Sequence, residues 1–336
     1  MNDKEIKKEW FYSQKRLDVS QCEKCEMLKV YRLGYTGQYI FEVEIESGIP
    51  GETVEIDQIT DIHFNYASLA DREDKEIVKT RKCRLWNGDG ESVMSAVKAM
   101  DVAEHADQTV ITGDTLDYLS RGGILLFKRY ITERDPNVMV TLGGHELTKQ
   151  MQTGESDRTS LDFRYELLES FWPHEMFYFS KSVKDKVLAV CLDNSRGVFH
   201  PITEKRLEDD IKKARNNGRI ILLFMHEPIK TNNTDGELRS IWAMSGAPKT
   251  FDFGEEAVGA AGHTDEVTDR VCKLISENAD VIKGIFCGHL HSAFYTSVCA
   301  TYRDENGLHS SKIPQIVTPG NPYLGHSGIV TRIIVR

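Results

Sequence analysis

The sequence predicts an α/β fold in which β-strands alternate with α-helices. Short apolar runs rich in branched residues recur along the chain between glycine or polar boundaries, and their length favours buried strands. Apolar residues at helical spacing lie between several of these runs. Strands that alternate with helices build a sheet covered by helices. The runs are VEIDQIT, QTVITG, NVMVTLGG, KVLAVCL, RIILLFM, VIKGIF, QIVTPG and GIVTRIIV.

The N-terminal part of the chain differs from the rest in pattern. Residues 1–27 are polar and weakly patterned, whereas apolar residues partly alternate from Leu28 to Glu46, with Gly34 and Gly37 between two runs. This pattern indicates a β-hairpin. A chain of 336 residues is long enough for one large core and a small appendage. We therefore expect a polar tail and β-hairpin extension over residues 1–50 and a main domain over residues 51–336.

Three helices are predicted from apolar residues spaced three or four positions apart. The second is expected to begin at Thr203 and to end at Asn217-Gly218, and the third to begin behind a Thr264 cap. The apolar faces are Val93, Val97 and Met100 in the first helix, Leu207, Ile211 and Ala214 in the second, and Val267, Val271, Leu274 and Ile275 in the third.

Composition argues against two kinds of partner. A formal net charge of −10 disfavours nucleic acids and anionic membranes, which attract clustered Lys and Arg. The N-terminus, MNDKEIKKEWFYSQKR, lacks the apolar core of a signal peptide, and no apolar run reaches the ~20 residues that span a bilayer. We therefore expect a cytoplasmic protein without a nucleic-acid or membrane partner. The sequence does not indicate an oligomeric state.

Histidine and carboxylate side chains follow the predicted strands, at the point where each strand ends. The chain has 11 histidines, and five of them lie in these segments. Ligand sites in α/β sheets form outside the carboxyl ends of the strands, so we expect these side chains to lie close together. The segments are Asp61-Ile62-His63, Gly113-Asp114-Thr115-Leu116-Asp117, Gly143-Gly144-His145-Glu146, His226-Glu227 and Gly288-His289-Leu290-His291.

The chemistry of these side chains is that of ligands for divalent metals. Carboxylate oxygen and imidazole nitrogen suit Zn, Mn and Fe. Asp61 and His63 stand two positions apart and face the same side of an extended chain, and His289 and His291 repeat this spacing. Together with Asp114 they offer more ligands than one ion needs, so the sequence predicts a two-metal site. Each motif alone is also compatible with a turn, a capped helix or a buried histidine, and the prediction rests on their combination.

The segments DIH, GDTLD, GGHE, MHEP and GHLH follow, in this order, the motifs of the calcineurin-like metallophosphoesterase superfamily. The sequence resembles in particular its cyclic-nucleotide phosphodiesterase and purple acid phosphatase-like branch. The resemblance runs from about Val54 to Val335. It implies a sandwich of two packed β-sheets flanked by helices, with the catalytic domain over residues 51–336.

Transferred residue by residue, the resemblance implies two divalent ions (Mn, Fe or Zn) and eight site residues. Asp114 resembles the carboxylate that bridges the ions, His145 the active-site histidine, and Asp117 the carboxylate that orients this histidine. The metal ligands are Asp61, His63 and His291 for the first ion and His226 and His289 for the second, with Asp114 shared.

The sequence departs from the family pattern at Gly144. The family has Asn at this position, and the amide oxygen of that Asn ligates the second metal. Glycine has no side chain. The resemblance therefore implies a second ion that is held more weakly, unless water or a neighbouring side chain replaces the missing ligand.

The implied function is hydrolysis of a phosphoester by a metal-activated hydroxide, with His145 acting on the leaving group. A small-molecule phosphodiester or phosphomonoester is favoured as substrate, because protein phosphatases of the family carry GDYVDRG and RGNHE-like signatures where this chain has GDTLDYLSRGG and LGGHE. Two alternatives stay open: a protein phosphatase, and a metal-poor scaffold that binds a protein partner without hydrolysis. The segment 229–264 is expected to shape the pocket, with Arg239 and His263 as candidates for phosphate contact.

Overall fold

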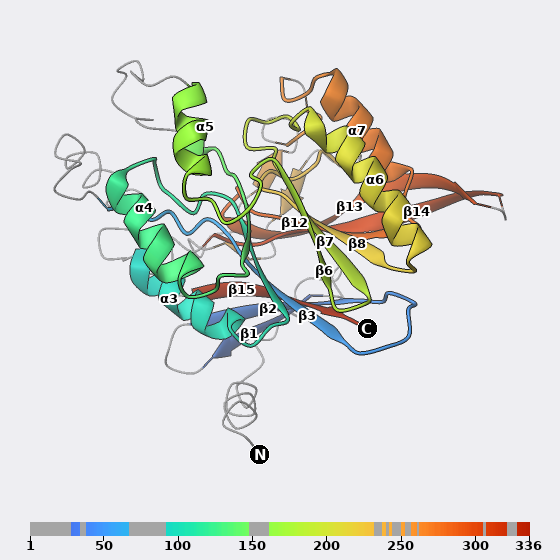
Figure 1. The fold of residues 1–336 in the computed structure, drawn as a ribbon. Coiled ribbons are helices and arrows are strands. Elements are labelled where there is room, and N and C mark those ends of the chain that lie inside the picture. The colour runs from blue at the N-terminus through green and yellow to red at the C-terminus, as the bar shows by residue number, and fades with distance from the viewer. Residues whose placement is uncertain are drawn as a thin grey trace.

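Two β-sheets pack face to face, and helices cover their outer faces (Figure 1). This arrangement confirms the predicted α/β sandwich. None of the helices in the described part of the chain has both the length and the apolar character needed to span a bilayer. The computed structural model describes residues 28–33, 38–66, 92–147, 161–231, 237–239, 242–243, 250–252, 257–260, 262–304, 307–320 and 328–336.

The first sheet has the strand order β1-β2-β15-β3-β4-β5. Strands β3, β4 and β5 run parallel, so their carboxyl ends lie at one edge. The last strand of the chain, β15, lies between β2 and β3 and runs parallel to β2 and antiparallel to β3. The strands are β1 (Leu28–Leu33), β2 (Gln38–Ile45), β3 (Val54–Ile59), β4 (Gln108–Thr112), β5 (Met139–Thr141) and β15 (Gly328–Val335).

The N-terminal hairpin expected from the sequence is present as β1 and β2, which pair antiparallel. Because β2 also pairs with β15, the hairpin extends the first sheet at its edge. The division of the chain near residue 50 stays a prediction.

The second sheet has the strand order β10-β13-β14-β12-β8-β7-β6. Strands β7, β8, β12 and β14 run parallel, and β6 and β13 pair antiparallel with their neighbours. Strands β9 (Glu237–Arg239) and β11 (Thr250–Asp252) form a separate pair. The strands of the second sheet are β6 (Tyr178–Val183), β7 (Val187–Leu192), β8 (Ile220–Phe224), β10 (Trp242–Ala243), β12 (Ile282–Cys287), β13 (Ser292–Asp304) and β14 (Gly307–Val317).

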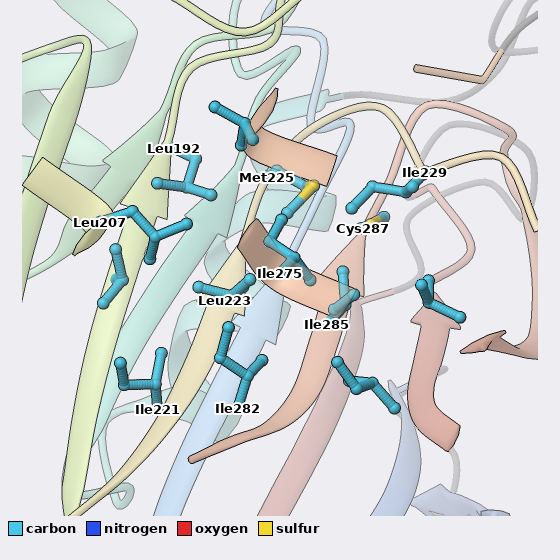
Figure 2. Close-up of a cluster of buried hydrophobic side chains, with 14 of the residues drawn as sticks. Leu192, Leu207, Ile221, Leu223, Met225, Ile229, Ile275, Ile282, Ile285 and Cys287 are labelled. Carbon is cyan, nitrogen blue, oxygen red and sulfur yellow. The ribbon is translucent and has the colours of Figure 1, made fainter. Parts of the chain in front are cut away.

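Three apolar clusters hold the layers together. Between the sheets, Phe41 and Ile56 of the first sheet join Phe224 and Phe286 of the second. A second cluster fills the space between the second sheet and its helices (Figure 2), and a third lies between the first sheet and its helices. Each fully buried large apolar side chain contributes roughly 1.5–3 kcal/mol. The helices are α3 (Ser92–Ala103), α4 (Arg121–Phe127) and α5 (Leu161–Glu169) on the first sheet, and α6 (Ile202–Asn216) and α7 (Glu266–Ser276) on the second.

The three predicted helices are present as α3, α6 and α7, with corrections to their details. Helix α6 begins at Ile202, and Thr203 is buried inside its first turn. Helix α7 is capped by Asp265, whose carboxylate accepts a hydrogen bond from the Thr268 N–H at 2.7 Å. Thr264 precedes this cap and bonds Asp269 instead. Adjacent Thr and Asp are both good caps, so the local sequence does not decide between them. In α3 the buried face is formed by Ala96, Ala99, Met100 and Ala103, with Val93 and Val97 half-buried beside it.

Candidate metal centre

Six carboxylate and imidazole side chains meet where strands of the two sheets end. Two of the contributing segments follow β3 and β4 of the first sheet, and two follow β8 and β12 of the second. Packing of the two sheets therefore brings together residues that are far apart in sequence. The six residues are Asp61 and His63 after β3, Asp114 after β4, His226 after β8, and His289 and His291 after β12.

Asp61, His63, Asp114 and His291 form a first group, in which the potential ligand atoms all lie within 4.8 Å of one another. The Nε2 atom of His291 lies 3.0 Å from Asp61 Oδ1 and 3.0 Å from His63 Nε2. His63 Nε2 also lies 3.7 Å from Asp114 Oδ2. Ligand bonds of about 2.0–2.2 Å place the donors of one ion about 3–4 Å apart. The first group therefore has the dimensions of a site for one ion.

Asp114, His226 and His289 form a second group. His226 Nε2 lies 3.3 Å from Asp114 Oδ2, the same oxygen that faces His63. The rings of His226 and His289 meet edge to face with their centroids 5.1 Å apart. Asp114 thus lies between the two groups, at the position that a bridging carboxylate requires.

The ring nitrogens in both groups face one another and the carboxylate oxygens. The Nε2 atoms of His63 and His291 face each other at 3.0 Å. The Nδ1 of His226 lies 2.8 Å from the Thr112 carbonyl oxygen, so Nδ1 carries a proton and Nε2 is the nitrogen that can ligate a metal once it is deprotonated. This buried Nε2 makes no hydrogen bond to any of the described residues. A buried nitrogen that faces a carboxylate oxygen at 3.3 Å favours positive charge between the two atoms, supplied by a proton or by a metal ion. The nitrogen and oxygen atoms offered suit Zn, Mn or Fe.

Hydrogen-bond donors from the neighbouring residue Thr60 and from two other loops hold the carboxylates of the site. Asp61 Oδ2 accepts hydrogen bonds from Thr60 Oγ1 at 2.7 Å and from the main-chain N–H of His289 at 3.0 Å. Asp114 Oδ1 accepts one from the main-chain N–H of His145 at 3.0 Å. In both residues the other carboxylate oxygen faces the histidines. One oxygen of each carboxylate is therefore fixed, and the other is turned toward the candidate ions.

Glu146 is a buried residue to which the sequence analysis gave no role. Its carboxylate accepts hydrogen bonds from the main-chain N–H groups of Asp114 (3.0 Å), Leu116 (2.8 Å) and Gly143 (2.8 Å). Burial, together with the charge of Asp114, raises the pKa of Glu146 to about 7. Glu146 joins the loop after β4 to the loop after β5, and its place in the GGHE segment was a signal that could have marked it.

Asn194, at the end of β7, holds the loop that carries His226. Its Oδ1 accepts hydrogen bonds from the main-chain N–H groups of His226 and Glu227, both at 3.1 Å, and its Nδ2 donates to the Glu227 carbonyl oxygen at 2.7 Å. Asn194 is completely buried. Its partners lie more than 30 positions along the chain, so no local pattern marks it.

Five of the six candidate ligands have a left-handed backbone conformation. Among the described non-glycine residues, Lys184 is the only other one with a positive φ. This conformation costs roughly 1–2 kcal/mol for an L-residue, and such strain concentrates at functional sites. The five φ values are 51° at Asp61, 50° at His63, 49° at Asp114, 70° at His289 and 50° at His291.

His145 and Asp117, the predicted catalytic pair, lie beside the first group. His145 Nδ1 is 2.7 Å from the main-chain oxygen of Asp117 and 3.4 Å from its Oδ1. The shorter contact is therefore with the main chain, and it leaves His145 Nε2 facing Asp114 Oδ2 at 3.8 Å. Asp117 Oδ1 is also 3.3 Å from His63 Nδ1. Asp117 contacts two histidines, one of them a candidate metal ligand.

The two glycines of the GGHE segment differ in their surroundings. A Cβ atom on Gly143 would lie 2.2 Å from Asp114 Oδ1, so only glycine fits there. A Cβ atom on Gly144 would meet the Ser195 carbonyl oxygen at 3.6 Å, an ordinary contact, and the φ of Gly144 is outside the left-handed region. The backbone at position 144 therefore accepts a side chain, and glycine is not required there by the fold.

Charges within the site shift the pKa values of its groups strongly. Burial opposes ionisation of Asp61, yet the charge of His291 holds the pKa of Asp61 well below its ordinary value. Burial also lowers the pKa of His63, but hydrogen bonding to Asp117 and nearby carboxylates raises it to about 10. Burial lowers the pKa of His289 to about 4. In the metal-free protein, protons on His63 and His226, whose pKa values are raised, therefore supply positive charge that the carboxylates attract, and bound metal would replace these protons.

The structure brings all eight predicted site residues into one cluster, and metal ligation by six of them stays a prediction. The further candidates for phosphate contact are less well supported. His263 lies with its Nδ1 3.9 Å from Glu227 Oε2. Arg239 belongs to β9, and its side chain lies outside the described part of the structure.

Two sheets with clusters of carboxylate and imidazole side chains at their strand ends are typical of a metal-binding α/β protein; besides the two groups above, His63, Asp117 and His145 form a third group that could hold an ion. The sequence profile of the calcineurin-like phosphoesterases matches residues 54–293. The match covers well over half of the chain, so the protein belongs to the calcineurin-like phosphoesterase family. This membership supports a metal-dependent hydrolase of phosphoesters.

Similar solved structures include a purple acid phosphatase, PPD1, from seeds of yellow lupin (Lupinus luteus), with 12% identity and a TM-score of 0.45. PhoD has 10% identity and a TM-score of 0.48, and a dimetal phosphatase from Danio rerio has 12% and 0.39. The match to the purple acid phosphatase covers 88% of this chain and 50% of that protein. The corresponding shares are 88% and 62% for PhoD, and 80% and 88% for the dimetal phosphatase. No curated protein matches the sequence. The family assignment therefore rests on the profile match.

Proposed function

We propose that this protein hydrolyses a phosphomonoester or phosphodiester of a small molecule at a dinuclear metal centre. The observation that carries the proposal is the pair of ligand groups that share Asp114, with His145 beside them. When bound, the two ions supply positive charge to the phosphoryl group and lower the pKa of the attacking water. The first ion would be held by Asp61, His63, Asp114 and His291, and the second by Asp114, His226 and His289.

The two ions are expected to differ in affinity. The first group offers four protein ligands and the second three, because Gly144 has no side chain to contribute. Three protein ligands are sufficient for a catalytic metal. We infer that the second ion binds more weakly and that its occupancy depends on added metal.

His145 is placed to act on the leaving group. Its Nδ1–H donates to the Asp117 carbonyl oxygen at 2.7 Å, and this orients Nε2 toward the ligand groups. The side chain is 19% exposed, so an incoming substrate can reach it. Proton donation from a positioned side chain accelerates a reaction by ~10²–10⁴-fold. Phosphoryl transfer otherwise requires positioning and charge stabilisation, so no serine or cysteine nucleophile is needed.

The alternatives are a protein phosphatase and a non-catalytic scaffold. The GDTLDYLSRGG and LGGHE segments favour a small-molecule substrate over a phosphoprotein. The presence of both ligand groups and of His145 favours an enzyme over a scaffold.

Metal analysis combined with a substrate screen tests the proposal. Purified protein supplied with Mn²⁺ or Zn²⁺ would be assayed on phosphomonoesters, phosphodiesters and phosphopeptides. We expect two equivalents of metal and turnover of the small esters. Asp114→Ala should lose at least ~100-fold in turnover, because it removes a ligand from both ions. Asp209→Ala, at an exposed position of α6, is the matched control and should retain activity.

Each alternative predicts a different outcome of this screen. Full metal content without turnover of any ester would indicate a scaffold. Preferential turnover of phosphopeptides would indicate a protein phosphatase. If Asp114→Ala kept two equivalents of metal and full turnover, the dinuclear centre would be wrong.

A further inference from the structure

Asn65, a residue outside the predicted site, bonds directly to Asp117. It stands two positions after His63, and its Nδ2 donates a hydrogen bond to Asp117 Oδ2 at 2.8 Å. An ionised carboxylate only accepts hydrogen bonds, so the NH₂ end of the amide must face Asp117. The orientation of the amide is therefore determined by its partner.

Main-chain contacts place Asn65 opposite Asp117. Phe64 and Leu116 form an isolated parallel bridge, and the Asp117 N–H donates to the Phe64 carbonyl oxygen at 3.2 Å. The Asn65 N–H donates to Ser92 Oγ at the start of α3, at 3.3 Å. The position of Asn65 is thus set by the loop after β4 and by α3, and the side chain needs no rearrangement to reach Asp117.

The Asp117 carboxylate lies between two histidines with different tasks. Its Oδ1 is 3.3 Å from His63 Nδ1 and 3.4 Å from His145 Nδ1, while its Oδ2 accepts from Asn65. The final torsion of an aspartate side chain is broad, so the carboxylate plane turns easily unless a hydrogen bond holds it. A turn of this plane would change the contact of Asp117 with both histidines at once.

We propose that Asn65 is a positioning residue that fixes the Asp117 carboxylate between His63 and His145. The carboxylate faces the ring of His63 at 3.3 Å and the ring of His145 at 3.4 Å, while the main-chain oxygen of Asp117 accepts the shorter bond from His145 at 2.7 Å. A turned carboxylate should therefore disturb the ring of His63 first and that of His145 to a smaller extent. The part of this inference that concerns the leaving group rests on the proposed hydrolysis. The part that concerns metal affinity does not.

Asn65→Asp tests the inference with little change in shape. It replaces the donor by a carboxylate that repels Asp117. We expect the tighter dissociation constant for Mn²⁺, measured by calorimetry on metal-free protein, to rise about tenfold or more, as is typical when a residue behind a metal ligand is lost. We also expect kcat to fall with little change in KM. The fall should be larger for an alkyl phosphoester than for a nitrophenyl ester, because nitrophenolate leaves without being protonated. Asn65→Gln keeps the amide donor and should recover part of both losses.

Asn278→Asp is the matched control, because it makes the same change of charge at the end of α7, where Asn278 Nδ2 bonds the Leu274 carbonyl oxygen. It should change neither quantity. Unchanged Mn²⁺ affinity in a folded Asn65→Asp protein would overturn the inference. Weaker metal binding with equal losses on both esters would remove the coupling to His145. If Asn65→Asp does not fold, Asn65→Ala is measured in the same way. If the wild-type protein hydrolyses no ester, the proposed function fails and metal affinity still decides the role of Asn65.

Discussion

At Asp61, His63, Asp114, His289 and His291, the backbone enters the left-handed region, with φ between 49° and 70°. A glycine at any of these positions would be less strained, since the strain comes from the Cβ atom. Hydrogen bonds from other loops hold the conformation, as the bonds from the main-chain N–H groups of His289 to Asp61 and of His145 to Asp114 illustrate. The side chains are kept at these positions in spite of the strain, which is expected where they serve a ligand.

The strain predicts an unusual order of stability among variants of the metal-free protein. His291→Gly should be more stable than His291→Ala by about 1 kcal/mol, because alanine keeps the Cβ that opposes a positive φ. At His226, whose φ lies outside the left-handed region, the alanine variant should instead be more stable than the glycine variant by roughly 0.5–1 kcal/mol. Urea unfolding in the presence of a chelator measures all four variants. The same order at both positions would mean that backbone strain does not explain the difference.

The site residues predicted from sequence share two properties that a single segment reveals. Each is a carboxylate or an imidazole, and each stands in a segment that directly follows an apolar run. Asn65 and Asn194 lack these properties, since they act on residues of other loops. Which loops meet is decided by the packing of the two sheets, and that information is absent from any one segment. Residues that hold the ligands in place were therefore missed.

The short strand β5 is bonded at its edge by a side chain, that of His174. It lies at the end of the first sheet and leads into the loop with Gly143 and His145. The Val140 N–H donates to His174 Nε2 at 2.8 Å, and His174 Nδ1 lies 2.8 Å from the Glu175 carbonyl oxygen. His174 must be neutral to accept the bond from Val140, because both nitrogens of a protonated imidazole are donors.

His174 therefore predicts a loss of stability in mild acid. Burial lowers the pKa of His174 to about 4, below the ordinary value of about 6.5 in the unfolded chain. Between these two pKa values the unfolded state binds a proton and the folded state does not. The stabilisation from the Val140–His174 hydrogen bond is therefore fully present above pH ~6.5 and is lost as the pH falls toward ~4. His174→Gln offers an acceptor that does not titrate. The difference in unfolding free energy between wild type and variant should shift by ~2–3 kcal/mol over this range. A difference independent of pH would exclude this role.

Element types were predictable where local pattern and burial agree. The apolar runs form β3, β4, β5, β7, β8, β12 and β15 and the end of β14, because buried parallel strands need continuous apolar sequence. The insertion of β15 between β2 and β3 was not predictable. It depends on pairing between the two ends of the chain, and the sequence of a single strand does not identify the strand beside which it lies. The predicted face of α3 was displaced in part, since Ala96, Ala99 and Ala103 are buried in the cluster against the first sheet beside Met100, whereas Val93 and Val97 are half-buried.

On the scale of the whole molecule, the candidate metal centre lies where the loops of the two sheets meet. The first sheet contributes Asp61, His63 and Asp114, and the second contributes the three remaining histidines. Ions bound here would therefore connect the two halves of the sandwich, and ions that bind only the folded state add to its stability. The same charges make metal binding a competition with protons.

This competition predicts that the metal binds more weakly as the pH is lowered. In the metal-free protein, the pKa of His63 is raised to about 10 by Asp117 and the nearby carboxylates, in spite of burial, so His63 holds a proton near neutral pH. The pKa of His226 is likewise raised well above its ordinary value by Asp114, whereas that of His289 is lowered to about 4, mainly by burial. Metal ligands must be deprotonated, so Mn²⁺ should release about one to two protons on binding near neutral pH. The apparent affinity should then fall up to tenfold per displaced proton for each unit by which the pH is lowered below the pKa of the protonated ligand, which for His63 is about 10. Calorimetric titration at one pH in two buffers of different ionisation enthalpy counts the protons. Asp117→Asn weakens the support for the charged form of His63 and should reduce the number released. Binding without proton release would mean that His63 and His226 are already neutral in the metal-free site, and the electrostatic account given for the cluster would be wrong.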